Sequence, residues 1–175
     1  EKFLTRTARH ECGHAVINIL SGNIPSYITI EARGNMGGYM EMSQEEKEAP
    51  EYTREELIWR IRTALGGRAA EIVCYGKNGG ISTGASNDLR AATNIAKNMI
   101  TCYGMDEVFG LAVMTDEEII GSSELRKRVN CILAEQLEET IKLINENRTL
   151  FDKLFDGLML KNRLTGEEIS ALINT

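Results

Sequence analysis

The sequence predicts a mainly α-helical fold with one small β-hairpin or sheet and a bundle of helices at its C-terminal end. Apolar residues recur every three to four positions through most of the chain, which is the period of an amphipathic helix. Both prolines, Pro25 and Pro50, lie in the first third of the 175 residues, so none interrupts a later helix. Hydrophobic residues make up 42% of the chain, which is enough to fill a core of ordinary size.

A single hairpin is predicted where the helical period breaks down. Residues 27–31 alternate β-branched with other side chains, which is typical of a strand. Residues 33–35 then form a turn, and residues 37–42 return as the second strand. A further short strand is expected at the apolar residues 111–114.

Helix boundaries are marked by capping signals. Thr53 with Glu56, and Thr165 with Glu168, have the spacing of a capping box, in which two side chains satisfy free N–H groups at a helix start. Ser86 is expected to cap the helix that follows a glycine-rich segment. The predicted helices cover about residues 5–20, 53–75, 86–103, 122–145, 148–160 and a short stretch after 165.

Charge and hydropathy exclude two classes of partner. The formal net charge is −6, whereas a general nucleic-acid binder would present a basic face. No apolar run approaches the roughly 18 residues that cross a bilayer, so no membrane segment is expected within this chain. The chain begins with Glu1 rather than Met, so we expect it to be part of a longer protein. We expect a cytoplasmic domain, with any membrane tether in a segment outside it.

The four cysteines, Cys12, Cys74, Cys102 and Cys131, indicate no site of their own. Their spacings are wide and none belongs to a CxxC pair, which argues against a disulfide framework and against a thiolate zinc site. Free thiols in a reducing compartment are expected instead.

The strongest chemical signal is His10-Glu11-Cys12-Gly13-His14, which fits the H-E-x-x-H pattern. At 3.6 residues per turn, the two imidazoles lie on one face of a helix and can hold one zinc ion. Glu11 can reach a metal-bound water and accept its proton, because zinc lowers the pKa of such a water to about 7. These are the only two histidines of the chain, and chance would rarely place both in one such motif.

A catalytic zinc ion needs a third protein ligand. The extended motif H-E-x-x-H-x-x-G-x-x-H is excluded, because Ile17 and Leu20 stand where its Gly and His would be. Since no other histidine exists, the third ligand is an Asp or Glu, or less readily a Cys. The pattern leaves several candidates open, chiefly Glu71 and Asp88, and either would serve equally well as a capping or solvated carboxylate.

Four segments of the chain share one order and spacing with a known family. They are the HExxH segment, Gly66-Gly-Arg-Ala-Ala-Glu71, Ser82-Thr-Gly-Ala-Ser-Asn-Asp-Leu89 and Tyr103-Gly-Met105. Together they closely resemble the peptidase domain of the FtsH-type AAA metalloproteases. The resemblance covers nearly the whole chain and is strongest from about residue 5 to residue 110.

The resemblance implies a role for each candidate carboxylate. In that family the third zinc ligand is the aspartate of the Ser-Asn-Asp-Leu segment, which is Asp88 here. Glu71 then orients a ligand imidazole and does not bind the metal. The family's domain forms a six-membered ring beneath an ATPase ring that feeds it unfolded chains. The resemblance therefore implies a homohexamer, unfolded polypeptide substrates and an AAA ATPase module in the same longer protein.

The chain departs from the family pattern at several positions. Ile72 follows Glu71 where the family usually has a second Glu, Cys12 stands where alanine is usual, and residues 32–34 replace a proline-containing turn. None of these is a metal ligand or the base, so a divergent but active member is expected. No Walker motif is present, so ATP is expected to act only through a module outside this chain.

A substrate-binding strand is predicted at Gly37, Gly38 and Tyr39. The backbone is the one constant feature of an unfolded chain, and an exposed strand edge pairs with any extended backbone. The two glycines would let a second backbone approach closely, and the segment matches a Gly-Tyr strand of the family. The alternative is that the glycines only shape the hairpin turn, where glycine supplies a positive φ.

The sequence thus predicts a single zinc metallopeptidase domain over residues 1–175, with a catalytic core over about 1–115 and a helical tail over about 116–175. The expected activity is zinc-dependent endopeptidase cleavage of unfolded proteins, as the proteolytic part of an ATP-dependent protease. Two alternatives stay open: a non-catalytic binding or scaffold domain, and a free-standing hydrolase of small peptides. Glu11 argues against the first, because a structural zinc site does not need that carboxylate.

Overall fold

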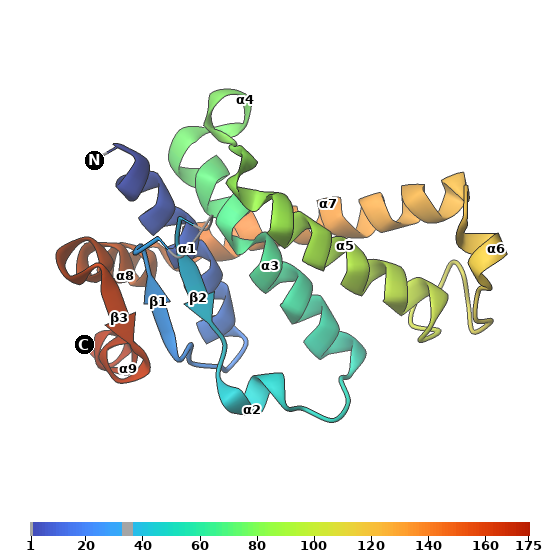
Figure 1. Cartoon of the computed structure of the whole chain (residues 1–175), viewed down its shortest axis with the longest axis horizontal. Helices are drawn as coiled ribbons and strands as arrows, with labels where there is room; N and C mark the ends of the chain where they lie inside the picture. The colour runs from blue at the N-terminus through green and yellow to red at the C-terminus, as the bar shows by residue number, and fades with distance from the viewer. Residues whose placement is uncertain (1, 33–36) are drawn as a thin grey trace.

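The computed structural model describes residues 2–32 and 37–175, and it confirms the mainly α-helical fold (Figure 1). The long helices are α1 (Lys2–Leu20), α3 (Arg54–Tyr75), α5 (Ser86–Thr101), α7 (Ser123–Glu146) and α8 (Arg148–Lys161). The short helices are α2 (Gln44–Lys47), α4 (Lys77–Gly80), α6 (Asp116–Ile119) and α9 (Gly166–Ile173), with a 3₁₀ turn, η1, at Thr83–Ala85. The turn predicted at residues 33–35 lies outside the described residues.

A small antiparallel sheet has the strand order β2-β1-β3. The predicted hairpin is present as β1 (Tyr27–Thr29) and β2 (Tyr39–Glu41), and Ile28 pairs with Met40 at its centre. The third strand, β3 (Arg163–Thr165), pairs with the other edge of β1 and was not predicted, because three residues are too few to show an alternating pattern. Within the described part of the chain, the outer edge of β2 has no strand partner.

Residues 111–114 form an irregular surface segment, so the strand predicted there is wrong. Leu111 is 87% exposed and Val113 is 67% exposed, so the stretch has no buried face that would favour an extended conformation. Nearby, Asp106 and Gly110 form an isolated bridge, and the Met114 N–H donates to the Thr101 carbonyl at the end of α5. Apolar composition alone was therefore a misleading signal for a strand.

Two clusters of buried side chains fill the interior. The first lies between α1, the sheet, α8 and α9, and includes Ile17, Ile28 and Phe151. The second lies between α3, α5 and α7, and includes Leu65 and Met99. Helix α1 packs against α3 and so joins the two clusters (Figure 1). The functional side chains described below lie along this junction.

Helix starts follow the predicted caps with one exception. Both capping boxes are present, at Thr53 with Glu56 before α3 and at Thr165 with Glu168 before α9. The cap predicted at Ser86 is wrong: Ser86 lies inside α5, and Ala85 holds the N-cap position without a side-chain bond. Because η1 leads directly into α5, the capping serine lies further upstream. It is Ser82, whose hydroxyl accepts a hydrogen bond from the Gly84 N–H.

Helices α1 and α3 approach closely because both carry glycine where they meet. A Cβ atom added at Gly66 would lie 2.6 Å from the Gly13 carbonyl oxygen, and one added at Gly13 would lie 2.7 Å from the Ala70 Cβ. These separations are shorter than packed atoms allow, so a larger side chain does not fit at either position. The close contact offsets the roughly 1 kcal/mol that glycine costs inside a helix relative to alanine.

Replacing Gly66 by alanine should lower the free energy of unfolding by about 1–3 kcal/mol, because the added methyl group forces α1 and α3 apart. Urea denaturation followed by circular dichroism measures this change. The matched control is Gly79→Ala in α4, where an added Cβ meets no atom within 4 Å. The control should be neutral or slightly stabilising. Equal stability of Gly66→Ala and the wild type would show that the contact does not require glycine.

Candidate metal centre

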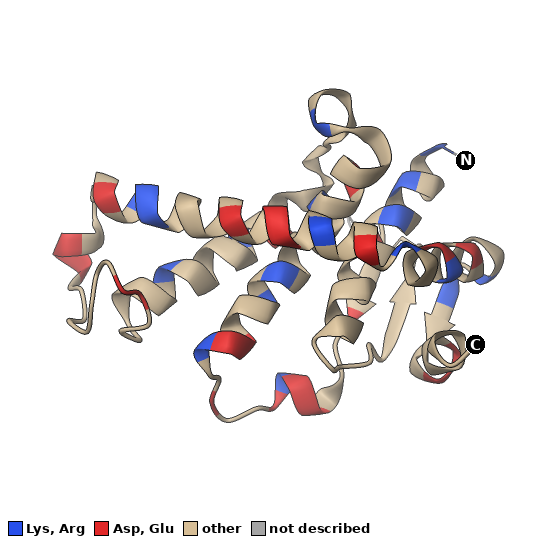
Figure 2. Ribbon diagram, turned by 180° about the vertical axis from the view of Figure 1, so that it is seen from behind, with Lys and Arg blue, Asp and Glu red and all other residues tan. Residues whose placement is uncertain are grey.

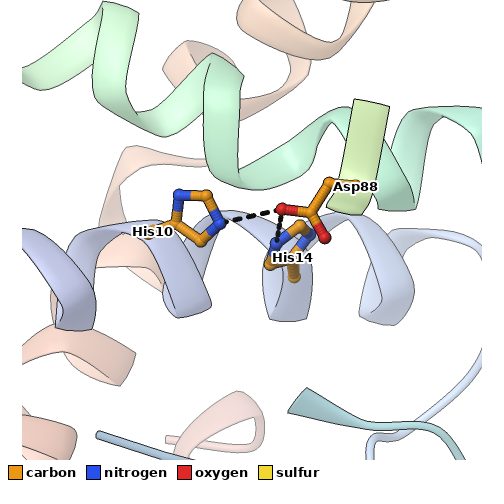
Figure 3. A group of neighbouring side chains, drawn as sticks. All are labelled: His10, His14 and Asp88. Atoms are coloured by element: carbon orange, nitrogen blue, oxygen red, sulfur yellow. Dashed lines mark hydrogen bonds and ion pairs between the residues drawn. The ribbon is translucent and has the colours of Figure 1, made fainter. Parts of the chain in front are cut away.

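Three side chains from two helices converge on one another (Figure 3). His10 and His14 lie on successive turns of α1, and Asp88 lies in the first turn of α5. Asp88 Oδ2 lies 3.0 Å from His10 Nε2 and 3.3 Å from His14 Nε2. One ligand atom from each residue lies within 4.8 Å of the others. The structure therefore brings together the three residues that were predicted as metal ligands.

A second hydrogen bond fixes each imidazole ring. His14 Nδ1 donates to the Thr63 backbone carbonyl at 2.7 Å, and His10 Nδ1 lies 3.1 Å from Glu71 Oε1. Burial raises the pKa of Glu71, but hydrogen bonds from His10 and from the loop after α4 outweigh it and lower the pKa to about 2. Glu71 is therefore an acceptor and His10 Nδ1 is a donor. The Nε2 atom of each ring is left as the nitrogen that can ligate a metal.

Ser82 is a positioning residue that the sequence analysis did not identify. Its hydroxyl donates to Glu71 Oε1 at 2.6 Å, and its backbone N–H donates to Glu71 Oε2 at 2.8 Å. Its carbonyl accepts a hydrogen bond from Arg68 at 2.9 Å. The loop that leads to Asp88 is thereby fastened to the carboxylate that holds His10. A serine within a glycine-rich stretch is a turn signal, and it could have pointed to this position.

Opposite charges hold the three converging side chains together. Burial alone lowers the pKa of His10, but hydrogen bonds with Asp88 and Glu71 and the charge of Glu11 raise it to about 9. The pKa of His14 is also raised, because its bond to Asp88 outweighs its burial. Burial raises the pKa of Asp88, yet hydrogen bonds from the two imidazoles outweigh it and hold this pKa well below its usual range. Asp88 is thus an ionised carboxylate at neutral pH.

The chemistry of these donors suits a zinc ion. Two imidazole nitrogens and one carboxylate oxygen are ligands of catalytic zinc sites, which keep a fourth position for water or substrate. The side chain of Asp88 is 29% exposed while both histidines are buried, so solvent reaches the three side chains from the side on which Asp88 and α5 lie. Among the described residues, this is the group of His, Cys, Asp and Glu whose ligand atoms lie close enough to share an ion.

Glu11 and Cys12 lie between the two histidines on α1 and are buried as well. Burial raises the pKa of the Glu11 carboxyl, and the charges on His14 and His10 oppose that rise. A carboxylate with a raised pKa accepts a proton more readily near neutral pH. Burial also raises the pKa of the Cys12 thiol, which is fully enclosed in the first cluster and packs as an apolar group.

The predicted substrate strand starts beside Glu11. A Cβ added at Gly38 would lie 2.6 Å from Thr7 Cγ2 and 2.9 Å from Glu11 Oε1, so glycine lets the chain lie against α1. Gly37 also lies against α1, where an added Cβ would be 3.1 Å from the Phe3 ring, and Gly38 has no positive φ that would require glycine. Tyr39 then begins β2. The missing side chain of Gly38 thus lets this segment lie against α1, and its role as a substrate strand stays a prediction.

An HExxH helix with a facing carboxylate is the arrangement of zinc-dependent metallopeptidases. Comparison with known proteins places this chain more narrowly. It matches peptidase family M41 over residues 1–172 and therefore belongs to that family.

Relatives agree with this assignment along nearly the whole chain. The ATP-dependent zinc metalloprotease FtsH of Mycoplasmopsis synoviae is 37% identical over 95% of this chain and 27% of its own length. The proteins of the same name are 38% identical in Mesomycoplasma conjunctivae, over 98% of this chain, and 36% identical in Clostridium perfringens, over 95% of it. The chain spans about a quarter of the length of these relatives. No helix in the described part of the chain is long and apolar enough to cross a membrane.

Zinc binding at the His10, His14 and Asp88 group should release protons, because an imidazole ligates only through a neutral nitrogen. With its pKa raised to about 9, His10 carries a proton at neutral pH that must leave first. We expect the zinc affinity to rise by at least about tenfold per pH unit from about pH 7 to about pH 9, more steeply where His14 also loses a proton, and then to level off. Calorimetric titration in buffers of different ionisation enthalpy counts the protons. A zinc affinity that stays constant over this range would contradict the coupling.

Proposed function

We propose that His10, His14 and Asp88 hold one zinc ion and that Glu11 is the general base of a peptidase site. The observation that carries this proposal is the convergence of the three ligand atoms within 4.8 Å, with Glu11 on the same helix as two of them. Glu71 supports the arrangement by orienting His10, as a carboxylate commonly does for a zinc-bound imidazole.

The proposed chemistry divides between the metal and the chain. A zinc ion held by His10, His14 and Asp88 would polarise the scissile carbonyl and lower the pKa of a coordinated water to about 7. Glu11 takes up a proton at its carboxylate and delivers it to the leaving amine. The raised pKa that burial gives Glu11 suits both steps, since the group must hold the proton between them. The Nδ1 bonds of His10 and His14 keep both rings in place while this happens.

We propose that an extended segment of an unfolded protein pairs with β2. The strand supports this proposal because its inner side pairs with β1 while its outer edge is open among the described residues. Gly38 leads into β2 directly beside Glu11, so a peptide on this edge would pass the general base. Main-chain hydrogen bonds at an open edge require no particular side chain, which suits substrates without a fixed shape.

We propose that the whole protein is an ATP-dependent protease. The relatives support this, since their names include ATP dependence and this chain spans about a quarter of their length. An AAA ATPase module elsewhere in the protein would unfold substrates and deliver them to the site. A ring of six copies, a cytoplasmic location and a membrane tether outside this chain belong to the same proposal and rest on the family resemblance alone.

Replacing Glu11 by glutamine should leave zinc binding intact and lower casein cleavage by about 10²–10⁴-fold. Glutamine has nearly the same shape, but its amide does not accept the proton. Zinc content by atomic absorption and cleavage of fluorescent casein by the full-length protein with ATP measure the two effects. The matched control is Glu117→Gln in α6, where the carboxylate is exposed and far from α1.

These two measurements, together with an assay of short-peptide cleavage, also separate the competing functions. Near-normal cleavage by Glu11→Gln would disprove the assigned base. A wild-type protein that binds zinc tightly but cleaves neither casein nor short peptides would instead be a binding or scaffold domain. Cleavage of short peptides without any cleavage of casein would indicate a small-peptide hydrolase.

A further inference from the structure

A cavity of about 270 Å³ lies between the end of α1, the short helix α2 and the first turns of α3. On the same measure one water needs about 10–15 Å³, so the cavity has room for a side chain. We call it the acidic cavity and define it by the wall residues that matter here: Glu45, Glu46, Tyr52, Glu56, Trp59 and Arg60.

The acidic cavity adjoins the metal centre. Thr63 also lines it, and the Thr63 carbonyl is the group that holds His14 Nδ1. On α1, Asn18 lies one turn beyond His14 and donates to both carboxylate oxygens of Glu46 at 3.1 Å and 3.0 Å. The chain also runs from β2 into α2, which carries Glu46 (Figure 1). A peptide lying along β2 would therefore span both the cavity and the metal centre.

The walls carry an excess of negative charge. Three of them are carboxylates, Glu45, Glu46 and Glu56, and none forms an ion pair with a described Lys or Arg. Figure 2 shows acidic residues both on α2 and in the first turn of α3, which are the two segments that face the cavity. Glu56 is ionised, because hydrogen bonds from Thr53 lower its pKa. Such walls favour a cationic guest.

Arg60 places a second, independent requirement on the ligand of the cavity, which is a hydrogen-bond acceptor. Its guanidinium lies over the Tyr52 ring, 4.5 Å from the centroid, and does not neutralise the carboxylates through a direct ion pair. One of its terminal nitrogens is buried without a hydrogen-bond partner among the described residues. A buried N–H group in that position calls for an acceptor. A metal cation would provide none, whereas a peptide carries a backbone carbonyl next to each side chain.

We propose that the acidic cavity is a substrate subsite that takes the Lys or Arg side chain of a bound peptide, with Arg60 donating to a backbone carbonyl of the same peptide. The cation lies among the three carboxylates, and its alkyl stem lies against Tyr52 and Trp59. This subsite rests on the proposed peptidase function, because it assigns a sequence preference to that site.

The geometry also gives the position of the basic residue. All pairings in the sheet are antiparallel, so a peptide that extends it at β2 runs opposite to that strand. β2 runs from Glu11 toward the cavity, and the peptide accordingly enters at the cavity and ends at Glu11. The distance from Gly38 to Glu41, where β2 ends shortly before α2, is about 10 Å at roughly 3.3 Å per residue. The basic side chain is therefore about the third residue before the scissile bond.

The test uses the full-length, zinc-loaded protein and quenched-fluorescence peptides that differ at one position. Lysine, the uncharged norleucine or glutamate is placed second, third or fourth before the scissile bond, or third after it. We expect kcat/KM for lysine to exceed that for norleucine by about tenfold at one of the three positions before the bond. The ratio within each enzyme variant is compared, so a change in overall activity does not affect the result.

Three variants locate the source of the preference. Glu45→Gln combined with Glu46→Gln should reduce the lysine-to-norleucine ratio to about one to twofold, and Glu45→Lys should favour the glutamate peptide. The matched control is Glu55→Gln, which removes a charge from the same turn of α3 as Glu56 but does not line the cavity. It should keep the wild-type ratio.

Each other outcome overturns the proposal. A wild-type ratio near one shows that no basic subsite exists, and a ratio that survives the double variant places the preference elsewhere. Equal loss in Glu55→Gln shows a diffuse charge effect, and a preference only after the scissile bond contradicts the peptide direction.

A binding arm separates this proposal from the peptidase function. Fluorescein-labelled forms of the same peptides are titrated into the full-length Glu11→Gln protein, and anisotropy gives the Kd of each. Tighter binding of the lysine peptide that depends on Glu45 and Glu46 supports the subsite even if the wild type cleaves nothing. Cleavage of all peptides with equal Kd and equal kcat/KM retains the peptidase function and rejects the subsite.

Discussion

The close packing of α1 on α3 is the constraint on which the site depends. The glycines at this contact bring the two helix backbones together. Helix α1 carries both imidazoles, and helix α3 carries both groups that orient them. Thr63 and Glu71, one on each side of the contact, bind His14 and His10 respectively. Gly67 serves the same end, since a Cβ there would collide with the His10 ring. A wider separation would lengthen both Nδ1 bonds, so the geometry of the imidazoles follows from the helix packing.

Charge balance explains how the buried group tolerates a divalent cation. Asp88 and Glu71 are ionised and flank His10 from opposite sides, and unpaired buried charges of this kind are strongly unfavourable. Protons on the imidazoles provide the balance, which is why the pKa of His10 is raised to about 9 and that of His14 is raised as well. A divalent cation that displaces these two protons leaves the total charge of the group unchanged. The negative charge of the same carboxylates is therefore balanced by protons in the metal-free protein and would be balanced by the metal ion in the proposed site.

The sequence was most informative where function depends on local spacing. The i, i+4 histidines and the capping boxes are properties of single helices, and these predicted helices are present in the structure. Pattern alone left Glu71 and Asp88 equivalent, because their difference lies in tertiary contacts with His10, and only the family resemblance separated them. The acidic cavity is assembled from α1, α2 and α3, and no local pattern describes it. Strand β3 was missed because three residues are too few to show an alternating pattern, and the role of Ser82 was missed because it depends on a tertiary contact with Glu71.

The central claim is that Asp88 completes a zinc site with His10 and His14. The most direct test is the zinc affinity of Asp88→Ala, measured by competition with a chromophoric chelator. Its matched control is Asn87→Ala, an exposed neighbour in the same turn of α5. The affinity of Asp88→Ala should fall by more than about 100-fold, because loss of a residue that only orients a ligand already costs 10–100-fold, while Asn87→Ala keeps the wild-type value. Unchanged zinc content and affinity in Asp88→Ala would contradict the account.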